Sequence, residues 1–424
     1  MPPPASPDRS YRDRLVDRLL VGDLGSIGAV LIEGVKSCGK TATARRHAAS
    51  EILLDRVPDA AQLVQVSPQV LLDGARPRLV DEWQRAPAVW DAVRRSVDDA
   101  PAPGQFLLTG SATPSDEVPR HSGAGRFAVR RMRPMALCET GHAEPVVSLR
   151  GLLAGAPQPS ARGALCVEDY AERIVVGGWP QLLDADPGTA ARFIDAYLDN
   201  LVEVDVSQVS AGRARNPHLV RRYLLAYAQL TAHPVPEAAI IRRASGTDDA
   251  LSRTAATAYL DALRRLMVVD EVGAWNPTLR SRSRLTAYPK RHLVDPSLAA
   301  GLLRASPGRL LGDLETFGFL FESLVTRDLR TLASASGADV FHYREQSGRM
   351  EVDLVVEDRE GAWIGVEVKV GGTHAVDRAA ATLLQLHEDR LQRPAAALVV
   401  ITAGEYCYRR PDGVYVVPLA CLGP

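Results

Sequence analysis

The chain has 424 residues, of which 46% are apolar and 24% charged, and its formal net charge is −1 with an isoelectric point near 6.8. These values are typical of a globular protein of two or three domains, and they exclude a general electrostatic attraction to nucleic acid. Because no apolar run is long enough to span a bilayer, and the N-terminal Met-Pro-Pro-Pro-Ala-Ser-Pro lacks the core of a signal peptide, we expect a cytoplasmic protein without membrane contact.

The first motif in chain order is a glycine-rich loop at 34–41, which reads G-x-x-x-x-G-K-T. An apolar run at 29–32 precedes it and a helix-forming stretch at 42–54 follows it, so the loop has the strand and helix that a phosphate-binding P-loop requires. We expect Lys40 to contact the β- and γ-phosphates of ATP and Thr41 to hold Mg²⁺. The expected phosphate-binding positions are Gly34, Ser37, Cys38, Gly39, Lys40 and Thr41.

A second predicted strand ends in two acids, in the sequence Leu-Val-Asp81-Glu82. In a parallel sheet the end of this strand lies beside the P-loop. We therefore expect Asp81 to order the Mg²⁺ ligands and Glu82 to polarise the attacking water. A further apolar run at 106–108 ends in Thr109-Gly-Ser111, whose hydroxyl groups are candidates for a position between the two acids and the γ-phosphate.

Arginines follow in the sequence Gly-Ala-Gly-Arg126 and at 130, 131 and 133. An arginine near the γ-phosphate neutralises charge in the transition state, and Arg126, in a glycine turn, is the candidate. The other three lie along a predicted strand, where arginines are often only solvated or paired.

The order of P-loop, acidic strand, polar strand end and arginine resembles the AAA-type ATPases of the AAA+ superfamily. Leu-Val-Asp81-Glu82-Trp-Gln-Arg-Ala-Pro, Leu-Leu-Thr109-Gly-Ser111-Ala and Gly-Arg126-Phe are similar to segments of a group of prokaryotic ATP-binding proteins. That group joins an AAA module to a C-terminal domain of unknown function with a nuclease-like fold, and the similarity covers nearly the whole chain. It implies ATP and Mg²⁺ as cofactors. It also allows for a homo-oligomer, in which Arg126 acts on a neighbouring subunit.

The middle of the chain is predicted to be helical after a linker at 154–163. Residues 235–294 resemble a winged helix, with helices at 237–243 and 252–267 followed by two wing strands. Two roles remain open: contact with DNA phosphates, with Arg253 and Arg264 on the recognition helix, or an interdomain spacer with solvated charges. The basic residues of the wing are Arg280, Arg282, Arg284, Lys290, Arg291 and His292.

The C-terminal third carries a second set of chemical groups. Glu322 lies on a predicted helix, Asp353 on the strand after it, and Glu367 and Lys369 two residues apart on the next strand, where they share one face. Two carboxylates that meet across paired strands offer the hard oxygen ligands of a divalent metal, with Asp353 and Glu367 as the ligands. A lysine beside them can orient a water molecule and stabilise phosphate charge.

This pattern resembles the PD-(D/E)xK nuclease superfamily, in which Glu322 corresponds to a helical glutamate often found in that fold. The predicted fold class is therefore α/β. It comprises an AAA-type P-loop domain at 1–155, a helical and winged-helix region at 164–305, and a restriction-endonuclease-like domain at 311–424. Because alternating charge is also typical of any half-exposed strand, cleavage of DNA or RNA does not follow from the fold.

Two functions follow from these predictions. One is an ATP-hydrolysing enzyme coupled to a DNA- or RNA-cleaving domain, and the other is a nucleotide-switched regulator or scaffold with an inert C-terminal domain. The loop also predicts a reactive thiol: Cys38 near a helix N-terminus is expected to be alkylated, and bound nucleotide to protect it. The cysteines are odd in number and scattered, which argues against disulfides and a zinc site: Cys38, Cys138, Cys166, Cys407 and Cys421.

Overall fold

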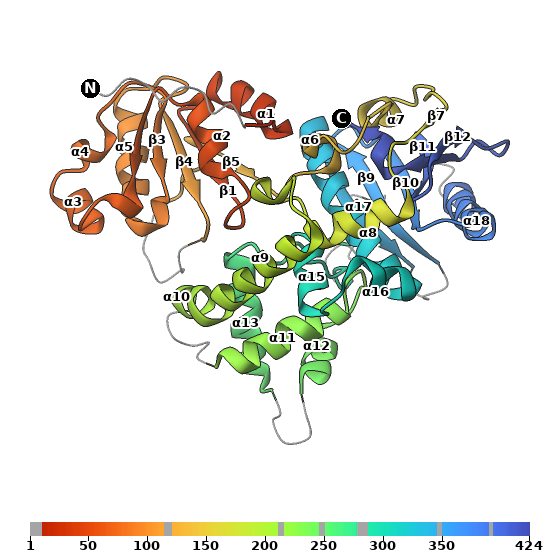
Figure 1. The fold of residues 1–424 in the computed structure, drawn as a ribbon. Coiled ribbons are helices and arrows are strands. Elements are labelled where there is room, and N and C mark those ends of the chain that lie inside the picture. Colours follow the sequence, from red (N-terminus) through yellow and green to blue (C-terminus); the bar gives the residue numbers. More distant parts are fainter. Residues whose placement is uncertain are drawn as a thin grey trace.

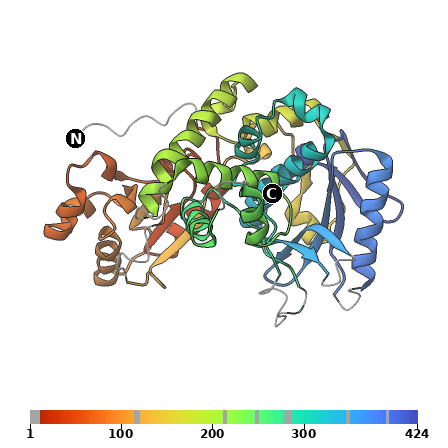
Figure 2. The ribbon, with the colours of Figure 1, turned by 90° about the horizontal axis from the view of Figure 1, so that it is seen from below.

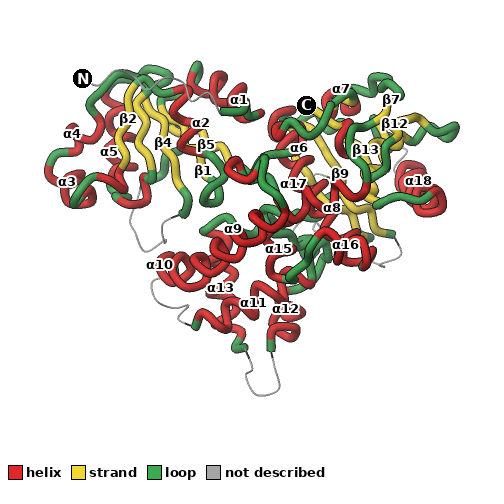
Figure 3. The backbone as a smooth tube through the Cα atoms, viewed as in Figure 1, coloured by secondary structure: helices red, strands yellow, loops and turns green. Residues whose placement is uncertain are grey.

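The computed structural model describes residues 11–113, 121–210, 216–245, 251–276, 278, 287–345, 350–389 and 393–424. Figure 1 shows an N-terminal α/β part in red and orange, a C-terminal α/β part in blue, and a helical part in green below them. In Figure 3 the yellow strands are gathered in the two α/β parts. Within these described ranges, no helix combines the length and the apolar character needed to cross a membrane.

The N-terminal sheet has five parallel strands in the order β2-β3-β4-β1-β5: Ser50–Leu53, Arg78–Asp81, Phe106–Gly110, Ala29–Glu33 and Phe127–Arg131. Val30 and Ile32 of β1 face one core cluster and Ala29 and Leu31 face another, as expected for a strand covered by helices on both sides. One face contacts α1 (Leu15–Leu24) and α2 (Lys40–His47), and the other contacts α3 (Ala60–Val66), α4 (Pro68–Leu72) and α5 (Val89–Asp99).

After β5 the chain enters the C-terminal part. Here β6 (Val147–Ser148) pairs with β14 (Leu422–Gly423), and β7 (Ala161–Arg162) pairs with β12 (Tyr406–Arg409). The short helices α6 (Leu137–Thr140) and α7 (Leu149–Leu153) lie in the same segment. The expected domain end at 155 and the expected linker at 154–163 are therefore corrected, because strands from this segment complete sheets of the C-terminal part.

The helical part confirms the two helices predicted around residue 250, α12 (Glu237–Ala244) and α13 (Arg253–Arg265). The Oγ of Ser252 accepts a hydrogen bond from the N–H of Ala255 at 3.2 Å, so Ser252 caps α13 as expected. The other elements are α8 (Val167–Val176), α9 (Pro187–Asn200), a π-helical turn at Leu201–Asp205, α10 (Val206–Val209), α11 (Pro217–Gln229), α15 (Pro296–Leu302) and α16 (Pro307–Gly312).

The two expected wing strands are replaced by isolated antiparallel bridges, which pair Val269 with Leu293 and Val272 with Lys290. Lys290, Arg291 and His292 are only 1%, 3% and 1% exposed, so they do not form a basic surface for DNA. Lys290 and His292 are buried against Glu322 and Ser323 of α17 (Leu314–Ser336), and Arg291 is buried against Val235 and Glu271 of the helical part. Arg280, Arg282 and Arg284 lie outside the described residues.

The C-terminal sheet has seven strands in the order β7-β12-β13-β11-β10-β9-β8. Its central strands are antiparallel at β9/β10 and parallel at β10/β11. The long helix α17 (Leu314–Ser336) and the helix α18 (Thr373–Asp389) pack against this sheet, and α17 contacts β8 and β10. The strands are β8 (Ala338–Arg344), β9 (Glu351–Asp358), β10 (Trp363–Lys369), β11 (Ala397–Thr402) and β13 (Tyr415–Pro418).

One apolar core runs through all three parts of the molecule. It includes Val30 in the N-terminal sheet, Tyr227 in the helical part and Val399 in the C-terminal sheet. Figure 2, seen from below, shows the green helices lying across the junction of the two α/β parts. A displacement at one sheet therefore acts on close-packed neighbours rather than on a flexible linker.

Candidate nucleotide site and C-terminal carboxylate cluster

The glycine-rich loop connects β1 to α2, as the sequence predicts. Ser37 and Gly39 have positive φ angles of 64° and 101°, which curl the backbone around the start of α2. A Cβ atom at Gly34 would collide with the main-chain oxygen of Met132, so only glycine fits there. The first N–H groups of α2, from Lys40 onward, have no acceptor within the helix, and they are free to bind an anion.

Lys40 lies within this loop and is 5% exposed. Its Nζ donates to the main-chain oxygen of Val35 at 2.9 Å. Because this acceptor is neutral, the charge of the ammonium group is available to a phosphate. Lys40 thus has the position that the sequence predicted for a phosphate-binding lysine.

Asp81 ends β3 beside the loop and links two predicted site residues. One of its carboxylate oxygens, Oδ1, accepts from the hydroxyl groups of Thr41 at 2.8 Å and Thr109 at 2.5 Å. Burial raises the pKa of Asp81, while these two hydroxyl groups lower it. The neighbours of the carboxylate are thus neutral donors, which a cation can replace.

Glu82 follows with a φ of 56°, a left-handed conformation that is costly for glutamate. Its N–H donates to Oγ1 of Thr109 at 3.1 Å, and its Oε2 accepts from Oγ of Ser111 at 2.8 Å. Gln84 also donates to Glu82, and to Ser111 at 3.1 Å. The structure thus brings Glu82, Thr109 and Ser111 together, and it adds Gln84, which lies in the same family-like segment as Glu82 but was not among the expected site residues.

Arg126 is not brought to the loop. It immediately precedes β5, and its main-chain oxygen accepts from the N–H of Ala29, the first residue of β1. The strands are parallel, so Arg126 lies at the opposite edge of the sheet from the loop, where it pairs with Asp98 at 2.7 Å. The expectation that Arg126 lies near the γ-phosphate of its own chain is therefore corrected.

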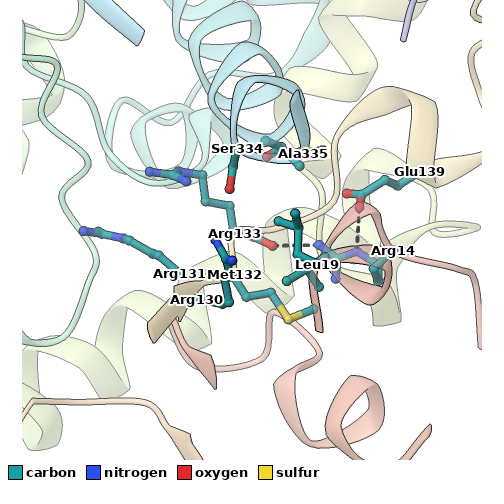
Figure 4. A pocket seen from close by; sticks show the side chains of 11 residues that line it. Arg14, Leu19, Arg130, Arg131, Met132, Arg133, Glu139, Ser334 and Ala335 are labelled. Atoms are coloured by element: carbon teal, nitrogen blue, oxygen red, sulfur yellow. Dashed lines mark hydrogen bonds and ion pairs between the residues drawn. The ribbon is translucent and has the colours of Figure 1, made fainter. Parts of the chain in front are cut away.

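Cys38 is fully buried, and its Sγ points toward the main-chain oxygen of Met132 at 3.6 Å. This placement contradicts the expected reactive thiol, because the side chain faces the core rather than the phosphate position. The main-chain oxygen of Cys38 accepts from Arg14 at 3.0 Å. Arg14 also bonds to Arg133 and pairs with Glu139, in a small pocket between the N-terminal part and the end of α17 (Figure 4).

The residues of the nucleotide site fit a magnesium nucleotide. Thr41 and Asp81 offer the hydroxyl and carboxylate oxygens that Mg²⁺ takes, and Lys40 with the start of α2 offers donors to phosphate. Glu82 lies one residue beyond Asp81, at the edge where β1, β3 and β4 end. This arrangement can bind a nucleotide and hold a water molecule beside its terminal phosphate.

The four predicted residues of the C-terminal domain do meet. Lys369 Nζ donates to Glu367 at 2.7 Å and to Oδ2 of Asp353 at 3.2 Å. Glu322, on α17, accepts from Lys290, which also donates to Asp353. The antiparallel register of β9 and β10, which pairs Leu354 with Val366, is the cause of this convergence.

A fifth residue completes this cluster. Lys290, from the segment expected to form a DNA-binding wing, places its Nζ 2.6 Å from Oε1 of Glu322 and 3.3 Å from Oδ1 of Asp353. Oε1 of Glu351 lies 3.7 Å from the same Nζ atom. We call Lys290, Glu322, Asp353, Glu367 and Lys369 the carboxylate–lysine cluster.

The cluster is strongly perturbed by burial. Burial raises the pKa of Glu322 to about 7, and burial together with the charge of Asp353 raises the pKa of Glu367. Burial also disfavours the charged form of Asp353, but Lys290 and Lys369 outweigh it and hold the pKa of Asp353 below its usual range. The cluster thus keeps one firmly ionised carboxylate between two ammonium groups.

This geometry does not fit a divalent metal. Both carboxylate oxygens of Asp353 already accept from ammonium groups, and Oδ2 also accepts from the N–H of Val368 at 2.9 Å. In the part of the chain that the structure describes, no three His, Cys, Asp or Glu side chains are grouped to hold a metal ion. The expected metal site at Asp353 and Glu367 is therefore filled by lysines in this conformation.

Comparison with protein families agrees with the N-terminal geometry. Residues 27–141 match the family model of an AAA domain. Residues 167–309 and 317–422 match two domains of unknown function, DUF8612 and DUF4143. The chain thus contains an AAA-type P-loop domain, followed by regions whose families carry no assigned function.

Similar proteins occur in mycobacteria. Uncharacterized protein Rv2008c of Mycobacterium tuberculosis and uncharacterized protein Mb2031c of Mycobacterium bovis are each 26% identical over 396 residues, which cover 92% of this chain and 79% of each relative. The Walker-type ATPase PABY2304 of Pyrococcus abyssi aligns with 68% of this chain and 94% of its own, at 12% identity and a TM-score of 0.39. These last values are too low to establish a shared fold.

Proposed function

We propose that the N-terminal part binds MgATP and hydrolyses it, and that the rest of the chain responds to the nucleotide. One observation supports the binding and hydrolysis of MgATP by the N-terminal part. The hydroxyl groups of Thr41 and Thr109 both donate to Oδ1 of Asp81, beside the loop that holds Lys40. These are the donor types that a P-loop enzyme uses for Mg²⁺ and phosphate.

In this proposal Lys40 and the start of α2 bind the phosphates, and Thr41 and Asp81 hold Mg²⁺. Bound Mg²⁺ neutralises charge on the phosphates. Glu82 orients the attacking water and accepts its proton, while Ser111 and Gln84 fix the Glu82 carboxylate. An arginine at position 126 can act only on a neighbouring chain, so its role requires a homo-oligomer. A rise in turnover per chain with protein concentration would support that role, and constant turnover would remove it.

Contacts between the helical part and the nucleotide site support the proposal that the rest of the chain responds to the nucleotide. Lys36 in the loop pairs with Asp205 at 2.5 Å. Just beyond Ser111, the N–H of Thr113 donates to the main-chain oxygen of Arg265, the last residue of α13, at 3.0 Å. A shift of the loop or of Ser111 on nucleotide binding would thus act directly on α10 and α13.

Asp270, which follows α13, connects the same segment to both α/β parts. Its carboxylate is bonded to Arg133 at 2.5 Å and paired with Arg330 of α17 at 3.3 Å. Burial opposes the charge of Asp270, but the surrounding arginines hold its pKa well below the usual range. We infer that α13 and Asp270 carry nucleotide-dependent shifts toward α17.

The test is ATP binding and phosphate release by the full chain with Mg²⁺. We expect Lys40→Ala to reduce turnover about 100-fold or more, as loss of a phosphate-binding donor does. Lys36→Ala is the matched control in the same loop, because its ammonium pairs with Asp205 instead, and it should retain turnover within a few-fold. Wild-type turnover at background level, or equal losses in both variants, would contradict the proposal.

A second candidate function concerns the C-terminal part. The convergence of Glu322, Asp353, Glu367 and Lys369 favours a nuclease-like fold that binds or cleaves DNA or RNA. The presence of Lys290 among them favours the alternative, a nucleotide-switched regulator or scaffold with an inert C-terminal domain. Cleavage of single- or double-stranded substrates with ATP and Mn²⁺, lost in Asp353→Ala, would establish the nuclease. Its complete absence would leave the regulator.

A further inference from the structure

Lysine is rare in this chain and occurs only at the two sites described above. Of the 50 basic residues, 46 are arginines and four are lysines: Lys36, Lys40, Lys290 and Lys369. Lys36 and Lys40 lie in the glycine-rich loop, and Lys290 and Lys369 lie in the carboxylate–lysine cluster. An ammonium group is a compact point charge, whereas a guanidinium is planar and larger, so the two are not interchangeable where a cation fits among closely spaced oxygens.

The ammonium group of Lys290 is bonded as a small cation would be. It is 1% exposed and donates to Glu322 Oε1 at 2.6 Å, to Asp353 Oδ1 at 3.3 Å and to the main-chain oxygen of Asp353 at 3.3 Å. Three N–H donors thus meet three oxygens. Two carboxylates and a carbonyl are also the ligand types that a divalent cation takes.

The second lysine occupies the other side of Asp353. Lys369 bonds Oδ2 of Asp353 and Oε2 of Glu367, so each oxygen of the central carboxylate faces a different ammonium group. Lys369 is part of the pattern that the sequence shows along one strand. Lys290 comes from another part of the fold, and its ammonium takes the place between Asp353 and the helix α17.

We propose that Lys290 is the resident cation of the C-terminal cluster and that it excludes divalent metal ions in this conformation. It is a positioning residue: it holds Glu322 and Asp353 together and occupies their shared oxygens. This inference rests on the cluster's geometry and not on ATP hydrolysis, so it can fail or hold independently of the proposed ATPase.

The backbone of Lys290 ties this cation to the helical part. Its N–H donates to the oxygen of Val272 at 2.9 Å, and its own oxygen accepts from the N–H of Val272 at 3.0 Å. Val272 follows α13, whose last residue bonds to Thr113 near the nucleotide site. A movement of the segments around 272 and 290 would therefore shift the ammonium group relative to Glu322 and Asp353.

The test is Mn²⁺ binding to the full chain without nucleotide, measured by electron paramagnetic resonance of free Mn²⁺. We expect the wild type to show no binding that depends on Asp353, which Asp353→Asn reports. Lys290→Met removes the charge but keeps an unbranched side chain, and it should gain one Mn²⁺ per chain with affinity at least 10-fold above the wild type. Adding Asp353→Asn to Lys290→Met should abolish that gain.

Lys36→Met is the matched control, since it removes an ion-paired lysine from the other site and should gain no Asp353-dependent Mn²⁺. A purely structural role for Lys290 would leave Mn²⁺ binding unchanged in Lys290→Met, which would overturn the proposal. If Lys290→Met does not fold, the wild type and its Asp353→Asn variant decide: Mn²⁺ binding to the wild type that is lost in Asp353→Asn overturns the proposal, and the absence of such binding supports it.

Discussion

The nucleotide site and the carboxylate–lysine cluster use the same residue types in opposite ways. At the nucleotide site Lys40 bonds a neutral carbonyl and Asp81 accepts from two hydroxyl groups. In the cluster, Asp353 accepts from two lysines. The first site keeps its charges available to ligands, whereas the second neutralises them internally. An aspartate and a lysine at strand ends thus indicate a cation site only when their charges are not already paired.

The largest predicted effect tests the nucleotide site, the first of the two sites compared above. Glu82→Gln keeps the shape of the side chain but removes the base, so we expect turnover to fall about 10²- to 10⁴-fold while ATP still binds. Phosphate release and nucleotide affinity measured on the same preparation check this. Gln84→Ala, which removes a donor to Glu82 and Ser111 but keeps the base, should cost less. Turnover of Glu82→Gln within three-fold of the wild type would remove Glu82 from the chemistry.

The next effect concerns stability at the cluster. Lys290→Ala leaves Glu322 and Asp353 buried without their cation, and we expect the free energy of unfolding to fall by about 3–5 kcal/mol. The Lys369 side chain is 31% exposed, so water compensates part of its loss and Lys369→Ala should cost less. Urea denaturation compares the two variants. An equal loss for both would contradict the buried role of Lys290.

A smaller effect tests the burial of His292, which lies next to the cluster. Burial, followed by the charge of Lys290, lowers the pKa of His292 to about 3. The free energy of unfolding is therefore at its full value above pH 6.5 and decreases as the pH falls, because the unfolded chain then binds a proton at His292 that the folded chain excludes. From pH 7 to pH 5 the wild type should lose about 2 kcal/mol more than His292→Gln. Parallel pH curves for the two proteins would refute the shift.

The smallest expected effect is an absence of reaction. Because the Cys38 side chain is fully buried against Met132, we expect N-ethylmaleimide to leave ATP binding unchanged. Mass spectrometry of the labelled protein should show no modification at Cys38, with or without MgATP. Labelling of Cys38 that nucleotide prevents would instead show that the thiol faces the phosphate position rather than the core.

Local patterns in the sequence predicted where the glycine-rich loop and the strands beside it lie. The loop at 34–41, Asp81 and Thr109 each lie next to a recognisable strand, and parallel strands bring their ends to one edge. The same rule should have excluded Arg126, which precedes its strand and so lies at the opposite edge. The direction of β5, and not the residue type near a glycine turn, determines the edge at which Arg126 lies.

Long-range packing accounts for most of what the sequence did not predict. Lys290 is 32 residues from Glu322 and 63 from Asp353, so no local pattern could join them. On sequence alone Lys290 is one of several basic residues of a predicted wing. Likewise, β7 lies in a stretch whose proline, alanine and glycine content is typical of a linker, and only its pairing with β12 shows its place in a sheet.

The central contrast between an open and a filled cation site is tested most directly by counting Mn²⁺ ions on the wild-type chain. The measurement compares the protein with and without a non-hydrolysable ATP analogue. We predict one Mn²⁺ per chain with the analogue, lost in Lys40→Ala, and none that depends on Asp353 in its absence. An Asp353-dependent Mn²⁺ on the nucleotide-free wild type, or no Mn²⁺ with the analogue, would contradict this account.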